Sequence, residues 1–156
     1  MFASLLVPEA FALPGDRERR VMPDSMIDHV DIRVSDVDAS RRFYEAALAP
    51  LSYRPRAERR DPAGGREIGF GIGDRSPFAI HSPATQPGQD TVTTGAHFAF
   101  AAESREDVQA FYAAAIAHGG TGIGEPGLRP EYDEAYYGAF VLDPDGNNVE
   151  AIARTR

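Results

Sequence analysis

The sequence predicts an α+β protein built from two related halves, each a strand followed by a helix and then two or three further strands. The main observation is a repeat at an offset of 68 residues, in which His29 and His97 each stand at the start of a strand-like stretch. Fourteen positions after each histidine comes a Phe-Tyr pair, Phe43-Tyr44 in the first copy and Phe111-Tyr112 in the second. In both copies, strand-type alternation passes into helix-type spacing. A matched repeat of this kind indicates a duplicated fold.

The first half contains one helix and four predicted strands. Residues 27–34 alternate between apolar and polar side chains, which predicts a strand with one buried face. Asp36 suits the N-cap of the helix that follows, and Pro50 marks the end of that helix. Further strands are expected at residues 53–59, 67–72 and 77–81, with glycine-containing turns at 61–65 and 73–74.

The second half repeats this order after an aperiodic stretch that contains prolines and threonines. We expect a strand at 96–101, a helix capped by Ser104, a short edge strand near 120–123, and strands at 136–142 and 147–153 around a turn. The predicted organisation is an N-terminal extension at 1–25 and a single domain at 26–156. Within that domain, module 1 spans 26–83, the linker 84–94 and module 2 95–154.

Composition narrows the possible functions. A net charge of −8 over 156 residues argues against general affinity for nucleic acid or anionic membranes. The apolar stretch 2–14 is broken by two prolines and a glutamate and lacks a basic leader, so we expect a cytoplasmic protein. Cysteine is absent, so any metal must be held by nitrogen and oxygen. No Gly-x-Gly-x-x-Gly motif follows a predicted strand and opens a predicted helix, and no Gly-x-Ser-x-Gly motif is present.

Four side chains suit metal binding and fall out of phase with the apolar residues of their own predicted strands. They are His29, His81, His97 and Glu150. Because the apolar face of each strand packs on a helix, these four are expected on the opposite face, where they can line a cavity. A buried carboxylate and imidazoles need partners, and a divalent cation such as zinc, nickel, iron or manganese satisfies them together.

Each candidate also has a simpler interpretation. A single strand histidine is most often a hydrogen-bonded core or surface group. The matched positions of His29 and His97, together with the late carboxylate Glu150, favour ligation, whereas both interpretations stay open for His81. His118 is assigned to the negative end of the second helix dipole.

These residues resemble the vicinal oxygen chelate superfamily, which includes glyoxalase I, extradiol dioxygenases and bleomycin resistance proteins. The resemblance covers residues 26–154 and is carried by His29 with Phe43-Tyr44, by His97, and by the run Phe-Val-Leu-Asp-Pro-Asp-Gly-Asn-Asn-Val-Glu that ends at Glu150. It implies paired βαβββ modules that form an open, incomplete barrel around a metal site, and a homodimer that acts on a small molecule. The implied ligands are His29, His97 and Glu150, with His81 as the closest match for a fourth.

Four further residues are candidates for substrate binding. Arg33 shares the predicted face of His29 and could hold an anionic group, with a surface salt bridge as the alternative. Arg129, Tyr132 and Tyr137 lie in a stretch that resembles one common in small members of the superfamily, where it could form a lid or a pocket wall. The alternative is a loop with tyrosines packed at its base, which we favour for Tyr136.

The resemblance implies three possible functions. The first is a glyoxalase-like lyase or isomerase with four protein ligands including His81, in which the metal stabilises an enediolate-like intermediate and Glu150 is the catalytic base. The second is an iron(II) extradiol dioxygenase, which needs only two histidines and one carboxylate. The third is a non-catalytic binding protein that sequesters a small molecule, as bleomycin resistance proteins do. We rank them in this order.

Overall fold

The computed structural model describes residues 27–83 and 91–154, so the predicted N-terminal extension and most of the predicted linker lie outside the described residues. The first half contains β1 (Val30–Arg33), α1 (Val37–Leu48), β2 (Arg54–Arg60), β3 (Arg66–Gly71) and β4 (Phe78–His81). The second contains β5 (His97–Ala101), α2 (Arg105–Ala117), β6 (Thr121–Leu128), β7 (Tyr136–Leu142) and β8 (Asn148–Arg154). The predicted order of elements is confirmed in both halves.

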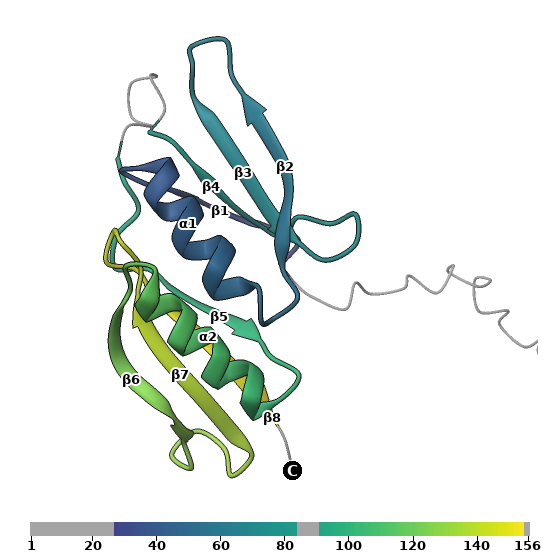
Figure 1. Cartoon of the computed structure of the whole chain (residues 1–156), viewed down its shortest axis with the longest axis vertical. Helices are drawn as coiled ribbons and strands as arrows, with labels where there is room; N and C mark the ends of the chain where they lie inside the picture. Colours follow the sequence, from purple (N-terminus) through teal and green to yellow (C-terminus); the bar gives the residue numbers. More distant parts are fainter. Residues whose placement is uncertain (1–26, 84–90, 155–156) are drawn as a thin grey trace, which may run out of the picture.

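The strands form two mixed four-stranded sheets with matching topology. Their orders are β1-β4-β3-β2 and β5-β8-β7-β6, and in each sheet the first strand pairs in parallel with the last strand of its half. Neither sheet closes on itself, so the described residues contain two open sheets rather than a closed barrel. The α+β fold class and the duplication are therefore confirmed (Figure 1).

Both helices begin where the sequence predicts. The Asp36 carboxylate accepts hydrogen bonds from the amides of Asp38 and Ala39 at the start of α1. Ser104 and Asp107 form a reciprocal capping box at the start of α2. Neither helix among the described residues has the length and hydropathy needed to cross a membrane.

The edge strand β6 is longer than expected. The sequence predicts strand only near residues 120–123, yet pairing with β7 continues to Leu128. The register is irregular between Gly122 and Gly124 and again between Gly124 and Gly127. Glycines and a proline hide the two-residue period, but a sheet edge tolerates bulges and a residue without an amide proton.

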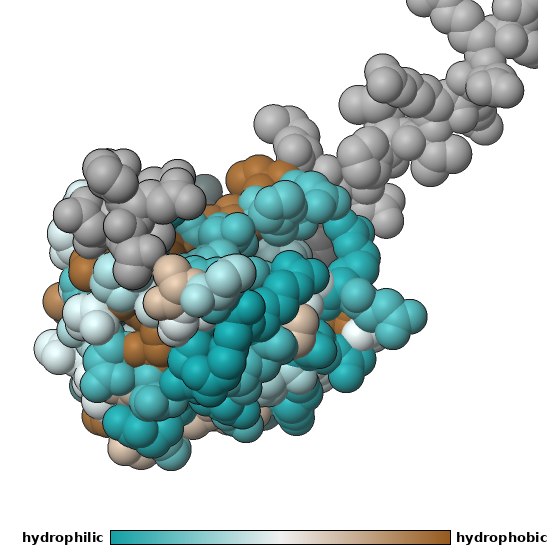
Figure 2. Space-filling view, turned by 90° about the horizontal axis from the view of Figure 1, so that it is seen from above, coloured by the Kyte–Doolittle hydropathy of each residue, from teal (hydrophilic) through white to brown (hydrophobic). Residues whose placement is uncertain are grey.

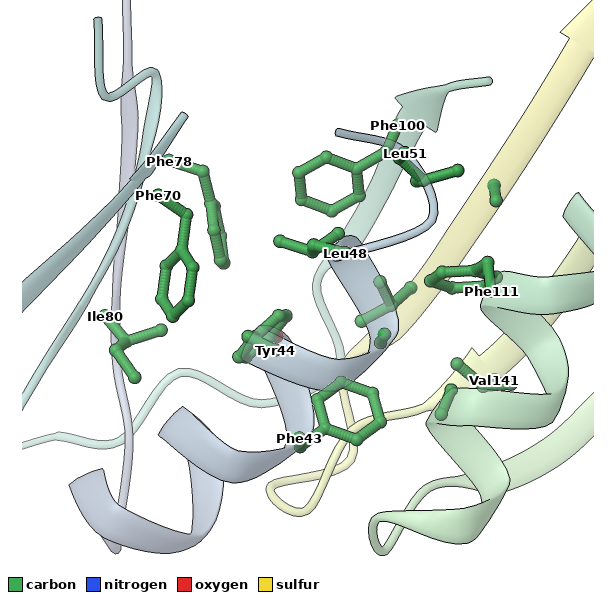
Figure 3. Packing of buried hydrophobic residues seen from close by; sticks show 14 of the residues in the cluster. Phe43, Tyr44, Leu48, Leu51, Phe70, Phe78, Ile80, Phe100, Phe111 and Val141 are labelled. Carbon is green, nitrogen blue, oxygen red and sulfur yellow. The ribbon is translucent and has the colours of Figure 1, made fainter. Parts of the chain in front are cut away.

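One hydrophobic core lies between the two halves. The helices α1 and α2 lie side by side, and each covers one face of its own sheet (Figure 1). In Figure 3, Tyr44 of α1 points toward Phe70 and Phe78 of the first sheet, and its ring centroid lies 4.9 Å from that of Phe78. Phe43 lies on the side of α1 that faces α2. The face of each sheet turned away from its helix, here called the open face, is therefore left outside this core.

The turn between β7 and β8 joins the two halves. The buried Asp143 carboxylate accepts a hydrogen bond from the Tyr44 hydroxyl at 2.6 Å and from the Asn147 amide group at 2.9 Å. The Asn147 side chain also donates to the backbone oxygen of Thr93 at 2.9 Å. The Asp-Pro-Asp-Gly-Asn segment thus fixes the start of β8, and with it the position of Glu150.

Candidate metal centre

Glu150 and His97 meet on the open face of the second sheet. Glu150 pairs with Ala99 and His97 pairs with Asn148, so the two side chains are diagonal neighbours on one face. The Nε2 atom of His97 lies 3.0 Å from Oε2 of Glu150. Glu150 is only 2% exposed, whereas the His97 side chain is 51% exposed. A buried carboxylate is thereby held beside an accessible imidazole, a donor pair suited to a divalent cation.

The second partner of Glu150 is Tyr136 of β7, which sequence reasoning assigned to packing. The Tyr136 hydroxyl donates to Oε1 of Glu150 at 2.6 Å. Burial, and then this hydrogen bond, raise the pKa of Tyr136 to about 12. The two-residue alternation of side chains along β7 could have identified this contact. Tyr136 and Phe140 lie on the same face of the strand, and Phe140 pairs with Glu150.

The open face of the first sheet has a hollow of about 600 Å³. His29, just before β1, lines this hollow together with Asp31, Arg56, Glu67 and other residues of the sheet. The Nδ1 atom of His29 lies 3.0 Å from an Asp28 carboxylate oxygen, and this hydrogen bond raises the pKa of the imidazole. His29 is accessible, with its side chain 62% exposed.

His81 lies at the end of β4, beside Arg33 and Glu67 in the strand register. Its Nε2 atom is buried and has no hydrogen-bond partner among the described residues, and a carboxylate oxygen of Asp31 lies 3.5 Å away. A buried ring nitrogen with only this long contact is unusual. However, His81 is not among the residues that line the hollow.

The strand register shows which residue of the first sheet corresponds to Glu150. Glu150 pairs with Ala99, whose repeat counterpart is Asp31, and Asp31 pairs with Ala79. The counterpart of Glu150 is therefore Ala79, and His81 corresponds to Ile152, one row further along. Matching by residue type alone placed His81 two positions out of register. Its role as a ligand stays a prediction.

The predicted substrate-binding residues lie in three places: near Glu150, on the helix-covered face of the second sheet, and on the first sheet. Tyr132 packs edge-on against Tyr136, and the guanidinium of Arg129 lies over the ring of Phe140, so both lie close to the Glu150 site. Tyr137 lies on the opposite face, where its hydroxyl accepts a hydrogen bond from Gln109 of α2. Arg33 lies on β1, and its amide donates to the Thr93 hydroxyl.

The donors on the two sheets do not meet within one chain. Over residues 27–83 and 91–154, no three histidine, aspartate or glutamate side chains are grouped closely enough to hold a metal ion. The chemistry of the donors nevertheless fits a divalent cation, because His97 and Glu150 are preassembled and His29 is accessible. Among the described strands, none pairs with the outer edge of β1 or of β5.

Comparison with known proteins assigns the family. The sequence profile of the Glyoxalase/Bleomycin resistance protein/Dioxygenase superfamily matches residues 26–151, and the chain belongs to this superfamily. A curated protein of Brassica oleracea var. gemmifera, named "Putative lactoylglutathione lyase", is 32% identical over 126 residues. That match covers 81% of this chain but only 43% of the relative, so the chain spans less than half of that protein.

Solved structures show the same fold. A glyoxalase/bleomycin resistance protein from Albidiferax ferrireducens T118 is 32% identical with a TM-score of 0.67, over 83% of this chain and 100% of that one. Glyoxalase I from Zea mays is 25% identical with a TM-score of 0.60, over 83% of this chain and 45% of that one. The superfamily and the fold agree with the resemblance found in the sequence.

Proposed function

We propose that this protein is a metal-dependent lyase or isomerase of the glyoxalase type, acting on a small substrate with two adjacent oxygens. The observation that carries the proposal is the buried Glu150 carboxylate, which lies 3.0 Å from the accessible His97 on an open sheet face. The similarity to a protein named as a lactoylglutathione lyase supports this reaction class.

The proposed metal ligands are His29, His97 and Glu150. The register puts Ala79 rather than His81 at the position equivalent to Glu150, so this proposal keeps three of the four expected ligands and leaves the other positions to the two substrate oxygens. A bound divalent cation supplies Lewis-acid stabilisation of negative charge on the two substrate oxygens. Glu150 is also the proposed catalytic base, as a displaceable ligand, because it is the carboxylate buried beside this site. Arg129 and Tyr132, which flank Tyr136 and Phe140, are proposed to contact the substrate.

A second copy of the chain completes the site in this proposal. Within one chain the donors of the two sheets stay apart, and the outer edges of β1 and β5 have no strand partner among the described residues. A two-fold dimer can bring the first sheet of one chain against the second sheet of the other and cover both edges. The expected assembly is a homodimer with two equivalent sites.

The proposal is tested by elemental analysis and by assay of untagged protein. Purified wild type is expected to hold one equivalent of a divalent metal per chain and to convert the methylglyoxal–glutathione hemithioacetal to S-lactoylglutathione. Glu150→Gln should lose the activity, whereas His118→Ala, at the end of α2 and away from the site, should keep it. The proposal would be contradicted if the wild-type protein bound added zinc, nickel, iron and manganese no more tightly than the Glu150→Gln variant does.

A second candidate is an iron(II) extradiol dioxygenase. It is favoured by the register, which puts Ala79 rather than a carboxylate at the position of the first sheet equivalent to Glu150, and so leaves two histidines and one carboxylate as the ligand set. Oxygen consumption with catechols by protein loaded anaerobically with ferrous iron would support this candidate. Ligand binding that is unaffected by a chelator would instead indicate a binding protein.

A further inference from the structure

Tyr136 and His97 divide the two oxygens of Glu150 between them. The Tyr136 hydroxyl donates to Oε1 at 2.6 Å, and His97 Nε2 lies 3.0 Å from Oε2. Two partners on opposite oxygens fix the rotation of a carboxylate group. Hydrogen bonds to a charged acceptor are about twice as strong as neutral ones, so this orientation is well determined.

The surroundings of Tyr136 are shaped for this contact. A Cβ atom at Gly138 would lie 3.0 Å from Oε1 of Glu150 and 3.1 Å from Cε1 of Tyr136, so a side chain there would crowd both groups. The guanidinium of Arg154 lies 5.2 Å from the centre of the Tyr136 ring, and the Tyr132 ring packs edge-on at 5.2 Å. The ring is thus held by contacts separate from its hydrogen bond.

We propose that Tyr136 is a positioning residue, which occupies Oε1 of Glu150 and leaves Oε2, on the His97 side, as the oxygen available to the metal. This inference rests on the proposed function, because it assumes that His97 and Glu150 bind a metal. Tyr136 acts through Glu150 and needs no contact with the metal or the substrate. In this role, Tyr136 would leave one oxygen of Glu150, rather than two, free to bind a metal.

Metal affinity and the ligand field report this role without any enzyme assay. Partners of metal ligands typically change affinity by 10- to 100-fold when removed. We therefore expect Tyr136→Phe to lower the Co²⁺ affinity of the untagged full-length protein by about 10-fold or more in calorimetry. The visible absorption spectrum of the Co²⁺ form should also change, because both carboxylate oxygens become available.

Tyr137→Phe is the matched control. It removes a hydroxyl from the neighbouring residue, whose hydrogen bond to Gln109 lies on the helix-covered face. We expect this variant to keep both the wild-type affinity and the wild-type spectrum. Gly138→Ala provides a second variant, because its new methyl group crowds Oε1 of Glu150 and the Tyr136 ring, so this pair must shift by a few tenths of an ångström while both side chains are kept. It should weaken Co²⁺ binding in the same direction.

Three outcomes separate the possibilities. Wild-type affinity and spectrum in Tyr136→Phe would overturn the positioning role and leave the proposed function standing. Equal losses in Tyr136→Phe and Tyr137→Phe would also overturn it, because they indicate a general effect on the sheet. If the wild-type protein binds no Co²⁺, the proposed function falls, and the positioning role falls with it.

Discussion

Ala79 of β4 occupies in the first sheet the position that Glu150 of β8 occupies in the second. The two residues pair with Asp31 and Ala99, which are counterparts in the repeat. Ala79 lines the hollow, so the duplicated fold presents a carboxylate on one sheet and open space on the other. The two sheets thus differ: the second holds the carboxylate that we propose as a metal ligand, and the first has a hollow at the equivalent position.

This asymmetry predicts that His81 is dispensable for metal binding. Its imidazole lies one row beyond Ala79 and does not line the hollow. We expect His81→Ala to keep the Zn²⁺ affinity within about three-fold of wild type, because losing a true ligand or its partner costs at least 10-fold. Calorimetric titration measures this, with His97→Ala as the variant that should lose binding. A large loss in His81→Ala would restore His81 as a fourth ligand.

Tyr44 is expected to contribute to stability through the junction between the halves. Its buried hydroxyl donates to Asp143 at 2.6 Å, so Tyr44→Phe leaves a buried carboxylate with one partner fewer. The expected loss is about 1–3 kcal/mol in the free energy of unfolding, measured by urea denaturation. Tyr53→Phe is the control, since Tyr53 packs edge-on against Phe100 in the same core. Equal effects in both variants would show that the Tyr44–Asp143 hydrogen bond adds nothing specific.

Alkaline pH should destabilise the protein in a window set by Tyr136. Its pKa rises from an ordinary 10.0 to about 12 in the folded state, chiefly by burial and then by the hydrogen bond to Glu150. The folded state therefore keeps a proton that the unfolded state loses, and stability falls as the pH rises from 10 toward 12. Burial also raises the pKa of Tyr44, which adds to the same trend.

Chemical denaturation at several pH values measures this dependence. Tyr136→Phe should show a shallower decline of the unfolding free energy above pH 10 than wild type. A decline of the same steepness in both proteins would contradict the assigned pKa. Tyr137→Phe serves as the control, because its hydroxyl is not bonded to a carboxylate.

The edge strand β2 of the first module is rich in exposed arginine. Seen from above, the end of the molecule formed by this module is mostly hydrophilic, with a few hydrophobic patches (Figure 2). Strand β2 contributes four exposed arginines, Arg54, Arg56, Arg59 and Arg60. Charged side chains on an edge strand discourage pairing with further chains, so we do not expect assembly through β2.

Local patterns were enough to predict the order of the elements and the shared face of His97 and Glu150. The two-residue period placed Glu150 and His97 on one face, and capping residues located both helix starts. What local patterns could not supply was the pairing between distant strands. The register decides that Ala79 rather than His81 corresponds to Glu150, and it depends on contacts that no single stretch of sequence encodes.

The two adjacent tyrosines of β7 show a similar limit of prediction from sequence. Tyr136 and Tyr137 are adjacent, so only the phase of β7 separates them, and that phase puts Tyr136 beside Glu150 and Tyr137 beneath α2. The same alternation that identified the histidines would have identified Tyr136 had it been applied to this strand. The separation of the two sheets within one chain, in contrast, has no local signature.

Mixing two inactive variants tests the central claim, that a metal site forms between two chains. His29→Ala disables the first sheet and Glu150→Gln the second, so neither homodimer has an intact site. After unfolding and refolding an equal mixture, each mixed dimer should contain one intact site, and about a quarter of all sites should bind Zn²⁺ at wild-type affinity. If wild type binds Zn²⁺ tightly but the refolded mixture recovers no such binding, the site is not shared between chains and the account is wrong.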